Sequence, residues 1–330
     1  MHKILIILPY FGKFPSYFSL FLKSCQYNPT IDWLIITDIK EEYDYPENVK
    51  VVYKTFDDLK AYFQNKFDFQ ITLHKPYKLC DYKPAYGYIF EEYVSGYDFW
   101  GHCDLDLLFG DLRSFITEDI LNKYDKIGHL GHLTLYRNSD EINKMFLYKA
   151  NGIERFREVF TTENSCIFDE WEDLSINKIC LYKEKSLYLW NGFLDIYPFD
   201  DNLLRVTRKI NMNNYSWSEE INRTPLYITW ENGKIFSNFR KKGKWCKEEF
   251  AYVHFQKRKM DVCFDEECSN VLCLPDRFVS NDDKKKQKYL LKTNLHRVFN
   301  KKRIKKSYQS FRYKLIVLTA PIRHKFRKKI

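Results

Sequence analysis

Short aliphatic runs alternate with amphipathic stretches through the first 110 residues, and this alternation restricts the possible folds more than any other feature. The aliphatic runs are residues 3–8, 33–37, 51–53 and 99–106. The stretches that favour helices are residues 16–27, 56–67 and 82–93. Apolar runs of this length are typical of strands buried on both faces of a sheet. We therefore predict an α/β fold, an open mixed sheet with helices on its faces.

The second half of the chain has a different pattern. Residues 126–137 favour two short strands, and residues 142–149, 153–160 and 168–182 favour helices. Residues 186–262 are rich in aromatic and turn residues and predict short β elements. We expect one body over 1–283, with halves 1–112 and 113–283, followed by a tail over 284–330.

Two carboxylates flank one leucine at the end of the apolar run 99–106. Asp104 and Asp106 are two residues apart, so on an extended chain their side chains point the same way. Paired carboxylates in an apolar setting need a compensating positive charge. Mg²⁺ and Mn²⁺ prefer oxygen ligands and are often held by one or two carboxylates together with substrate phosphates. The pair therefore predicts a metal and diphosphate site; the alternative is a solvated turn.

Three of the predicted strands end in polar or loop residues. Residues 10–13 follow the first strand, Asp38 follows the second, and Asp104 and Asp106 end the last. In open α/β sheets, ligands bind beyond the carboxyl ends of the strands. We expect these residues to line one crevice.

Charge is distributed unevenly along the chain. The net charge is +10, yet residues 284–330 hold 18 Lys and Arg and no Asp or Glu. The preceding 283 residues then carry 36 basic and 44 acidic side chains, a net charge of −8. The tail also contains regularly placed aromatic and aliphatic residues, a pattern typical of segments that lie on an anionic membrane. The alternative is a solvated extension.

Nine scattered cysteines and a short, proline-broken N-terminal apolar run give no sign of a disulfide framework or a signal peptide. We expect a cytoplasmic protein that is peripheral at the inner face of the plasma membrane.

Five segments resemble glycosyltransferases of the GT-A fold, specifically those of bacterial capsular and cell-surface polysaccharide biosynthesis. They are residues 5–12, 78–87, 97–106, 128–138 and 251–258. The resemblance implies a nucleotide-binding, Rossmann-like first half and an acceptor-side second half. It also implies transfer of a sugar from a nucleotide sugar, with UDP-sugar as the expected class, to a lipid-linked or polysaccharide acceptor.

The resemblance further implies a bound Mn²⁺ or Mg²⁺ on the donor diphosphate. Carried over, Asp106 binds the metal, Asp104 contacts metal or ribose, and His254 is the third protein ligand. Taken alone, His254 between apolar neighbours favours a hydrogen-bonded core histidine; the nearby cations Lys257 and Arg258 shift the interpretation toward a metal ligand.

The remaining candidates are assigned to the donor or to the acceptor. The donor-side candidates are Tyr10, Phe11, Gly12, Asp38, Lys78, Asp81, Lys83 and Lys257. Tyr10 is expected to stack on a nucleobase or to pack at an edge, and Lys83 to contact phosphate or sugar at a helix start. Lys78 and Asp81 are close enough to pair with each other instead.

Acceptor-side chemistry needs a group that takes a proton from the acceptor hydroxyl. Asp169 and Glu170 are the catalytic candidates, although acidic residues at a helix start are also favoured by the helix dipole alone. His132 and Asn138 are weaker acceptor-side candidates.

Two other functions compete with sugar transfer. One is another metal-dependent phosphate-handling enzyme, such as a nucleotidyl- or phosphotransferase. The other is a nucleic-acid-binding protein that uses the basic tail. The net acidic body and the lack of a nucleic-acid-binding motif argue against the second, so no nucleic-acid partner is expected.

Overall fold

A seven-stranded mixed sheet combines strands from residues 4–103 with three strands from residues 126–188. The structure is a computed structural model that describes residues 1–150, 152–211, 216–256, 258–264 and 268–281, with Lys284 and Lys288. The strands of this sheet are β1 (Ile4–Pro9), β2 (Ile31–Thr37), β3 (Val49–Tyr53), β4 (Phe99–Cys103), β6 (Lys126–Ile127), β7 (Leu133–Arg137) and β10 (Leu187–Tyr188). Their order is β10-β6-β7-β4-β1-β2-β3.

The direction of the strands decides where their polar ends meet. β1 is parallel to both β2 and β4, and β2 is parallel to β3. β7 is antiparallel to β4 and to β6. The carboxyl ends of β1, β2 and β4 therefore lie at one edge of the sheet, where the sequence predicts the binding residues.

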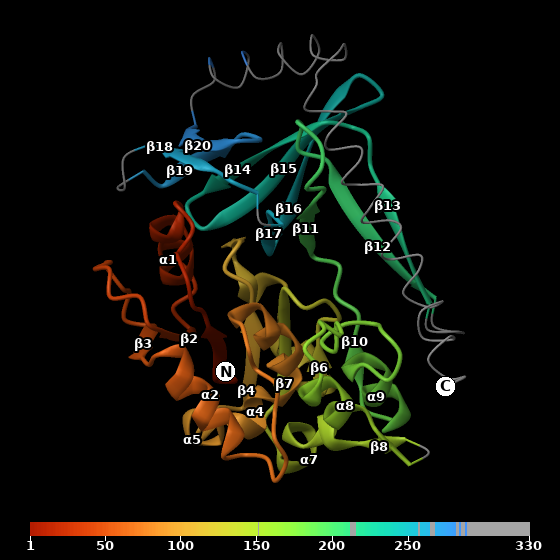
Figure 1. Ribbon diagram of the computed structural model, residues 1–330. Helices are drawn as coiled ribbons and strands as arrows, with labels where there is room; N and C mark the ends of the chain where they lie inside the picture. Colours follow the sequence, from red (N-terminus) through yellow and green to blue (C-terminus); the bar gives the residue numbers. More distant parts are fainter. Residues whose placement is uncertain are drawn as a thin grey trace.

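Helices cover the sheet. The α-helices are α1 (Phe18–Gln26), α2 (Phe56–Gln64), α3 (Leu79–Tyr82), α4 (Tyr86–Ile89), α5 (Glu91–Val94), α6 (Glu118–Lys123), α7 (Asp140–Asn143), α8 (Arg155–Thr161) and α9 (Ile176–Tyr182). Short 3₁₀ turns are η1 (Pro76–Lys78), η2 (Lys83–Ala85), η3 (Leu112–Ser114) and η4 (Met145–Leu147). Figure 1 shows α2, α4, α5, α7, α8 and α9 gathered around the first sheet in the lower part of the molecule.

Strand β1 shows why the sequence forms this layered structure. Leu5 and Ile7 belong to the core cluster shared with α2 to α5, whereas Ile4, Ile6 and Leu8 belong to the cluster shared with α1. A strand buried on both faces needs apolar residues at consecutive positions, as this segment has.

The second half of the molecule is built from β elements, as predicted for residues 186–262. One sheet has the order β13-β12-β11-β17-β5 and a second has the order β16-β15-β14-β19-β20-β18. The strands of the first are β5 (Leu107–Phe109), β11 (Phe193–Ile196), β12 (Arg205–Asn211), β13 (Ser216–Ile221) and β17 (Tyr252–His254). Those of the second are β14 (Leu226–Glu231), β15 (Lys234–Lys241), β16 (Lys244–Phe250), β18 (Asp261–Cys263), β19 (Asn270–Cys273) and β20 (Arg277–Ser280). β8 (Lys149–Ala150) and β9 (Ile153–Glu154) form a separate small hairpin.

The chain passes from one sheet to the other immediately after β4. Only three residues separate β4 in the first sheet from β5 in the β11–β17 sheet. Figure 1 shows β11 to β20 in the upper part of the molecule, above the first sheet. The predicted carboxylate pair therefore lies at the junction between two sheets.

Four predicted elements differ from the structure. In place of the helix predicted over 142–149, α7 ends at Asn143 and is followed by η4 and by β8, which begins at Lys149. The strand predicted over 99–106 ends at Cys103, and the helix predicted over 168–182 begins only at Ile176. The helix predicted over 82–93 is instead broken into the short elements η2, α4 and α5. Gly87 lies so close to Trp100 that a Cβ there would approach the indole Nε1 to 2.2 Å, so this series follows the packing against β4.

Within the described ranges, every helix is too short or too polar to cross a bilayer. The predicted membrane-surface tail over 284–330 lies outside the described residues apart from Lys284 and Lys288.

Candidate metal and active site

Asp104 and Asp106 lie in the tight connection between β4 and β5. The amide N–H of Asp104 donates to the His132 carbonyl at 2.9 Å, and the Phe255 N–H donates to the Asp106 carbonyl at 2.9 Å. Between the two acids, Leu105 is buried in the core. Backbone contacts on both sides and a buried leucine thus hold the two carboxylates in place although the strand has already ended.

His254 brings a third potential ligand to this connection. It ends β17, which pairs with β5 so that His254 lies opposite Leu107. One ligand atom each from Asp104, Asp106 and His254 lie within 4.8 Å of one another, and His254 Nε2 is 3.5 Å from Asp106 Oδ1. The structure therefore brings together the three residues that the sequence nominates as metal ligands.

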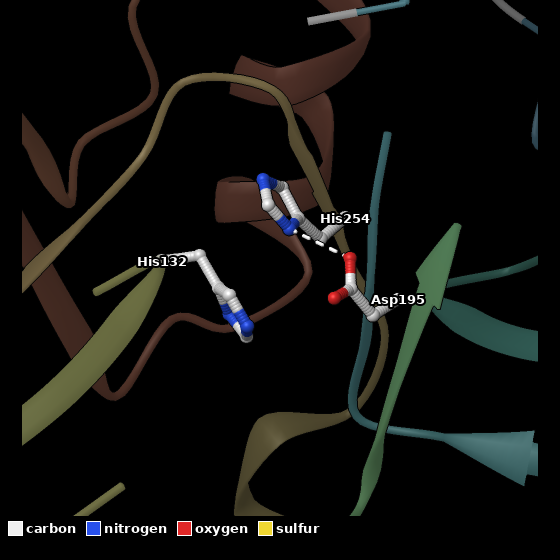
Figure 2. A group of neighbouring side chains, drawn as sticks. All are labelled: His132, Asp195 and His254. Carbon is white, nitrogen blue, oxygen red and sulfur yellow. Dashed lines mark hydrogen bonds and ion pairs between the residues drawn. The ribbon is translucent and has the colours of Figure 1, made fainter. Parts of the chain in front are cut away.

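Asp195 holds the imidazole ring from the other side. It lies on β11, in register with His254 on β17, and its side chain is only 1% exposed. His254 Nδ1 donates to Asp195 Oδ1 at 2.9 Å, as Figure 2 shows, and Gln256 Nε2 donates to the same oxygen at 2.7 Å. Since Nδ1 carries the proton of this bond, Nε2 is the nitrogen left for a metal. Histidines that bind metals commonly have a carboxylate partner of this kind.

Sequence reasoning missed Asp195. Its signal was available, because it is a lone carboxylate in the apolar segment 193–196 and a buried charge requires a partner. The partner is remote in sequence, so only the pairing of β11 with β17 identifies it.

The protonation of His254 depends on the two neighbouring acids, Asp106 and Asp195. Burial lowers the pKa of His254, but Asp106 and Asp195 outweigh burial and raise the pKa to about 10. Burial acts to raise the pKa of Asp195, but His254, Arg208 and the hydrogen bond from Gln256 together outweigh burial and lower it. A proton on Nε2 and a divalent cation at Nε2 are alternative ways to compensate the same carboxylates.

The donor set fits the predicted cation. Two carboxylates and one imidazole offer the oxygen ligands that Mg²⁺ and Mn²⁺ prefer, with a nitrogen that Mn²⁺ tolerates better than Mg²⁺. The Asp195 Oδ2 atom is buried and has no hydrogen-bond partner among the described residues.

His132 lies beside this cluster. Its ring centroid is 4.6 Å from that of His254, and one ligand atom of His132 lies within 4.8 Å of those of Asp195 and His254. Its Nδ1 atom is 2.8 Å from the Tyr252 hydroxyl. Burial lowers the pKa of His132, so the ring is neutral. Figure 2 shows the ring next to Asp195 and His254, so His132 belongs with the metal cluster.

Lys83 connects the metal cluster to a second pair of acids. Its ammonium is buried and lies 2.6 Å from Asp104 Oδ1 and 3.5 Å from Asp169 Oδ2, and it donates to the Gly131 carbonyl at 2.7 Å. Burial acts to lower the pKa of Lys83, but Asp104 and the other nearby groups raise it well above its usual value. Lys83 is therefore a cation held between two carboxylates.

Asp169 and Glu170 lie in the turn that precedes α9, not in its first helical turn as predicted. Asp169 is only 5% exposed, and burial raises its pKa to about 7 despite the nearby Lys83 ammonium. Glu170 accepts from the Gly131 N–H at 3.1 Å and lies 3.8 Å from the Arg208 guanidinium. A helix dipole therefore does not account for these acids.

Residues after β1 and β2 lie at the same sheet edge. Tyr10 is half-buried and its hydroxyl donates to the Lys13 carbonyl at 3.0 Å; burial and then Asp106 raise its pKa. Gly12 has a left-handed φ of 118°, and a side chain there would meet no atom within 4 Å. Asp38 is exposed.

Phe11 belongs to the hydrophobic core. Its ring packs against Phe56 at a centroid distance of 5.3 Å and its side chain is buried. Only its backbone is therefore available to a ligand.

Lys78 and Asp81 pair with each other. Lys78 Nζ lies 2.8 Å from Asp81 Oδ2, and each side chain is 1% exposed. Neither side chain faces a place where a nucleotide can reach it.

Two other polar side chains bind backbone carbonyls. Arg258 donates to the carbonyls of Pro275, Tyr197 and Asp200, and Asn138 donates to the carbonyls of Val94 and Tyr97. Lys257 lies outside the described residues.

Taken together, these features define a mixed α/β protein with a carboxylate and imidazole cluster at the edge of its parallel strands. The chain belongs to a family of unknown function (DUF6625), whose model matches residues 6–282. Comparison with curated proteins gives no match.

Solved structures with partial likeness include two of LgtC. One is galactosyltransferase LgtC in complex with donor and acceptor sugar analogs, at 12% identity and a TM-score of 0.35, covering 59% of this chain and 76% of that chain. The other is an active-site mutant of LgtC, at 12% identity and a TM-score of 0.36, covering 59% and 75%.

Proposed function

We propose that this protein is a metal-dependent glycosyltransferase that moves a sugar from a nucleotide sugar to a hydroxyl group of a glycan acceptor. The observation that carries the proposal is the convergence of Asp104, Asp106 and His254 at the carboxyl edge of parallel strands, with Asp195 fixing the imidazole. Such an edge is where open α/β sheets bind nucleotides. UDP-sugar as donor class follows from the sequence resemblance.

Three side chains would bind the metal that the reaction requires. Asp104, Asp106 and His254 Nε2 would hold Mn²⁺ or Mg²⁺, which when bound supplies Lewis-acid stabilisation of the leaving diphosphate. Asp195 keeps a proton on Nδ1, so Nε2, which faces Asp106, is the ring nitrogen that would bind the metal once its own proton is released.

The proton of the acceptor hydroxyl needs a base, and Asp169 fits this role. With a pKa of about 7, its carboxyl is partly ionised at neutral pH and can accept a proton there. Lys83 lies between Asp169 and Asp104 and stabilises the ionised form of both. One buried ammonium thus couples the metal side to the acceptor side.

The basic tail suggests where the acceptor is found. We place the protein at the inner membrane face, with residues 284–330 on anionic lipid and a lipid-linked or polysaccharide acceptor. Each surface cation near such lipid is worth about 1 kcal/mol.

Product analysis tests the proposal. The full chain is incubated with a panel of nucleotide sugars and Mn²⁺, and released nucleoside diphosphate is measured with and without chelator. Asp106→Asn is expected to abolish release, while Asp57→Asn, which changes an exposed acid on α2, is the matched control. Release unaffected by chelator and by Asp106→Asn would overturn the proposal, and release of pyrophosphate would indicate nucleotidyl transfer.

A further inference from the structure

The segment that carries Asp169 is fastened to the body by the buried pair Lys78 and Asp81. Lys78 Nζ donates to the Asn164 carbonyl at 2.7 Å. Asp81 accepts from the Cys166 N–H at 3.0 and 3.1 Å and from the Phe168 N–H at 3.3 Å. The pair thus binds three backbone groups of residues 164–168, immediately before Asp169.

The fastened segment contains a strained residue. Ile167 has a φ of 52°, in the left-handed region that β-branched side chains rarely adopt. Such a conformation persists only where the surroundings hold it, and it is found most often at functional sites. The Ile167 side chain is 45% exposed, so its own packing does not supply the restraint. The restraint comes from the hydrogen bonds that the Cys166 and Phe168 amides, on either side of Ile167, donate to Asp81.

The Asp169 carboxylate has little room to move. A Cβ on Gly131 would lie 2.2 Å from Asp169 Oδ2, so the carboxylate lies directly over this glycine. The same carboxylate reaches Lys83 at 3.5 Å, and Lys83 follows Asp81 by two residues. One short segment, residues 78–83, therefore both fastens the turn and contacts the carboxylate that the turn delivers.

We infer that Lys78 and Asp81 are positioning residues, which hold the strained turn at Ile167 so that Asp169 faces Lys83 and the metal cluster. The inference rests on the proposed function for the role of Asp169. It replaces the nucleotide contact that the sequence suggests for these two residues.

Hydrogen exchange tests the fastening independently of activity. In Asp81→Asn, the amides of Cys166 and Phe168 are expected to exchange at least about tenfold faster, because each loses a bond to a charged acceptor. Glu91→Gln is the matched control, since it removes a carboxylate from an exposed pair with Lys66. Unchanged exchange in Asp81→Asn would overturn the inference.

Kinetics test the purpose of the fastening. Transfer to acceptor is expected to fall about 10- to 100-fold in Asp81→Asn, as for displaced catalytic groups, with donor KM and Mn²⁺ affinity unchanged. Faster exchange with unchanged transfer would refute a positioning role. A wild-type chain that turns over no nucleotide sugar would refute the proposed function and this catalytic purpose together, whereas unchanged exchange in an active chain would refute the inference alone.

A second variant covers the case in which Asp81→Asn does not fold. Ile167→Asn places a residue that tolerates left-handed φ in the turn and removes little buried surface. Exchange at Cys166 and Phe168 is expected to slow and the thermal midpoint to rise by about 2 °C. Where both variants fold, the effect of Asp81→Asn on exchange is expected to be smaller in the Ile167→Asn background. Exchange that is unchanged or faster in Ile167→Asn would contradict the inference.

Discussion

Metal binding is expected to expel a proton from His254. In the metal-free protein, the two carboxylates at 2.9 and 3.5 Å from the ring nitrogens hold the pKa of His254 at about 10. At pH 7.5 the ring is then protonated, and a cation at Nε2 releases about one proton. A histidine with an ordinary pKa of about 6.5 would release only about 0.1 proton under the same conditions.

The size of the effect follows from this difference. Between pH 7.0 and 8.5, the association constant for Mn²⁺ is expected to rise about tenfold per pH unit, or about 1.4 kcal/mol per unit. In the metal-free protein, the folding stability that His254 contributes changes with pH in the opposite direction and falls as pH rises. Because the folded pKa of His254 is raised, its contribution to folding stability is complete below about pH 6.5 and is lost as pH rises toward 10.

Titration calorimetry measures both quantities. Mn²⁺ is titrated into the protein at one pH in two buffers with different ionisation enthalpies, which gives the number of protons released. Asp195→Asn removes one of the two carboxylates that raise the pKa, so proton release should fall and the pH dependence should flatten; Asp57→Asn should behave as wild type. Release near 0.1 proton, or an affinity independent of pH above 7, would refute the account of His254.

Three further predictions concern the catalytic side chains. Asp106→Asn is expected to lower metal-dependent turnover by about 100-fold or more, measured as nucleoside diphosphate release at saturating Mn²⁺; a smaller loss would argue against direct ligation. In wild type the transfer rate is expected to rise as pH increases through about 7, because the Asp169 carboxyl must be ionised to accept a proton, and this rise should be absent in Asp169→Asn. Gly131→Ala forces a Cβ to within 2.2 Å of Asp169 Oδ2, so we expect a loss of about 1–3 kcal/mol in denaturant unfolding together with impaired transfer; full activity would show that Asp169 can move freely.

The first sheet could be predicted from the sequence because its signal is local. The consecutive apolar residues of β1 and β2 correctly indicated strands buried on both faces, and β3 and α2 begin close to their predicted positions. Local signals were weaker where packing overrides them. The segment around Gly87 breaks into short helices against Trp100, and β4 ends at Cys103 because the chain passes there into the five-stranded sheet.

The candidate site shows the same division. Asp104 and Asp106 were nominated from their neighbours in sequence and His254 from the resemblance, and the structure brings the three together. Asp195 was missed, and the pairing of Lys78 with Asp81 was left open, because both depend on partners that only the folded chain brings close. Single-sequence reasoning finds residues that look unusual where they stand, but it does not find the residues that support them.

The passage from β4 to β5 gives a cation in this site a mechanical consequence. Asp104 and Asp106 lie on the link between β4 of the seven-stranded sheet and β5 of the five-stranded sheet, whereas His254 and Asp195 come from strands β17 and β11 of the five-stranded sheet alone. An ion bound there would link the seven-stranded sheet to the five-stranded sheet. Removing it with a chelator should therefore destabilise both sheets, and not only one surface loop.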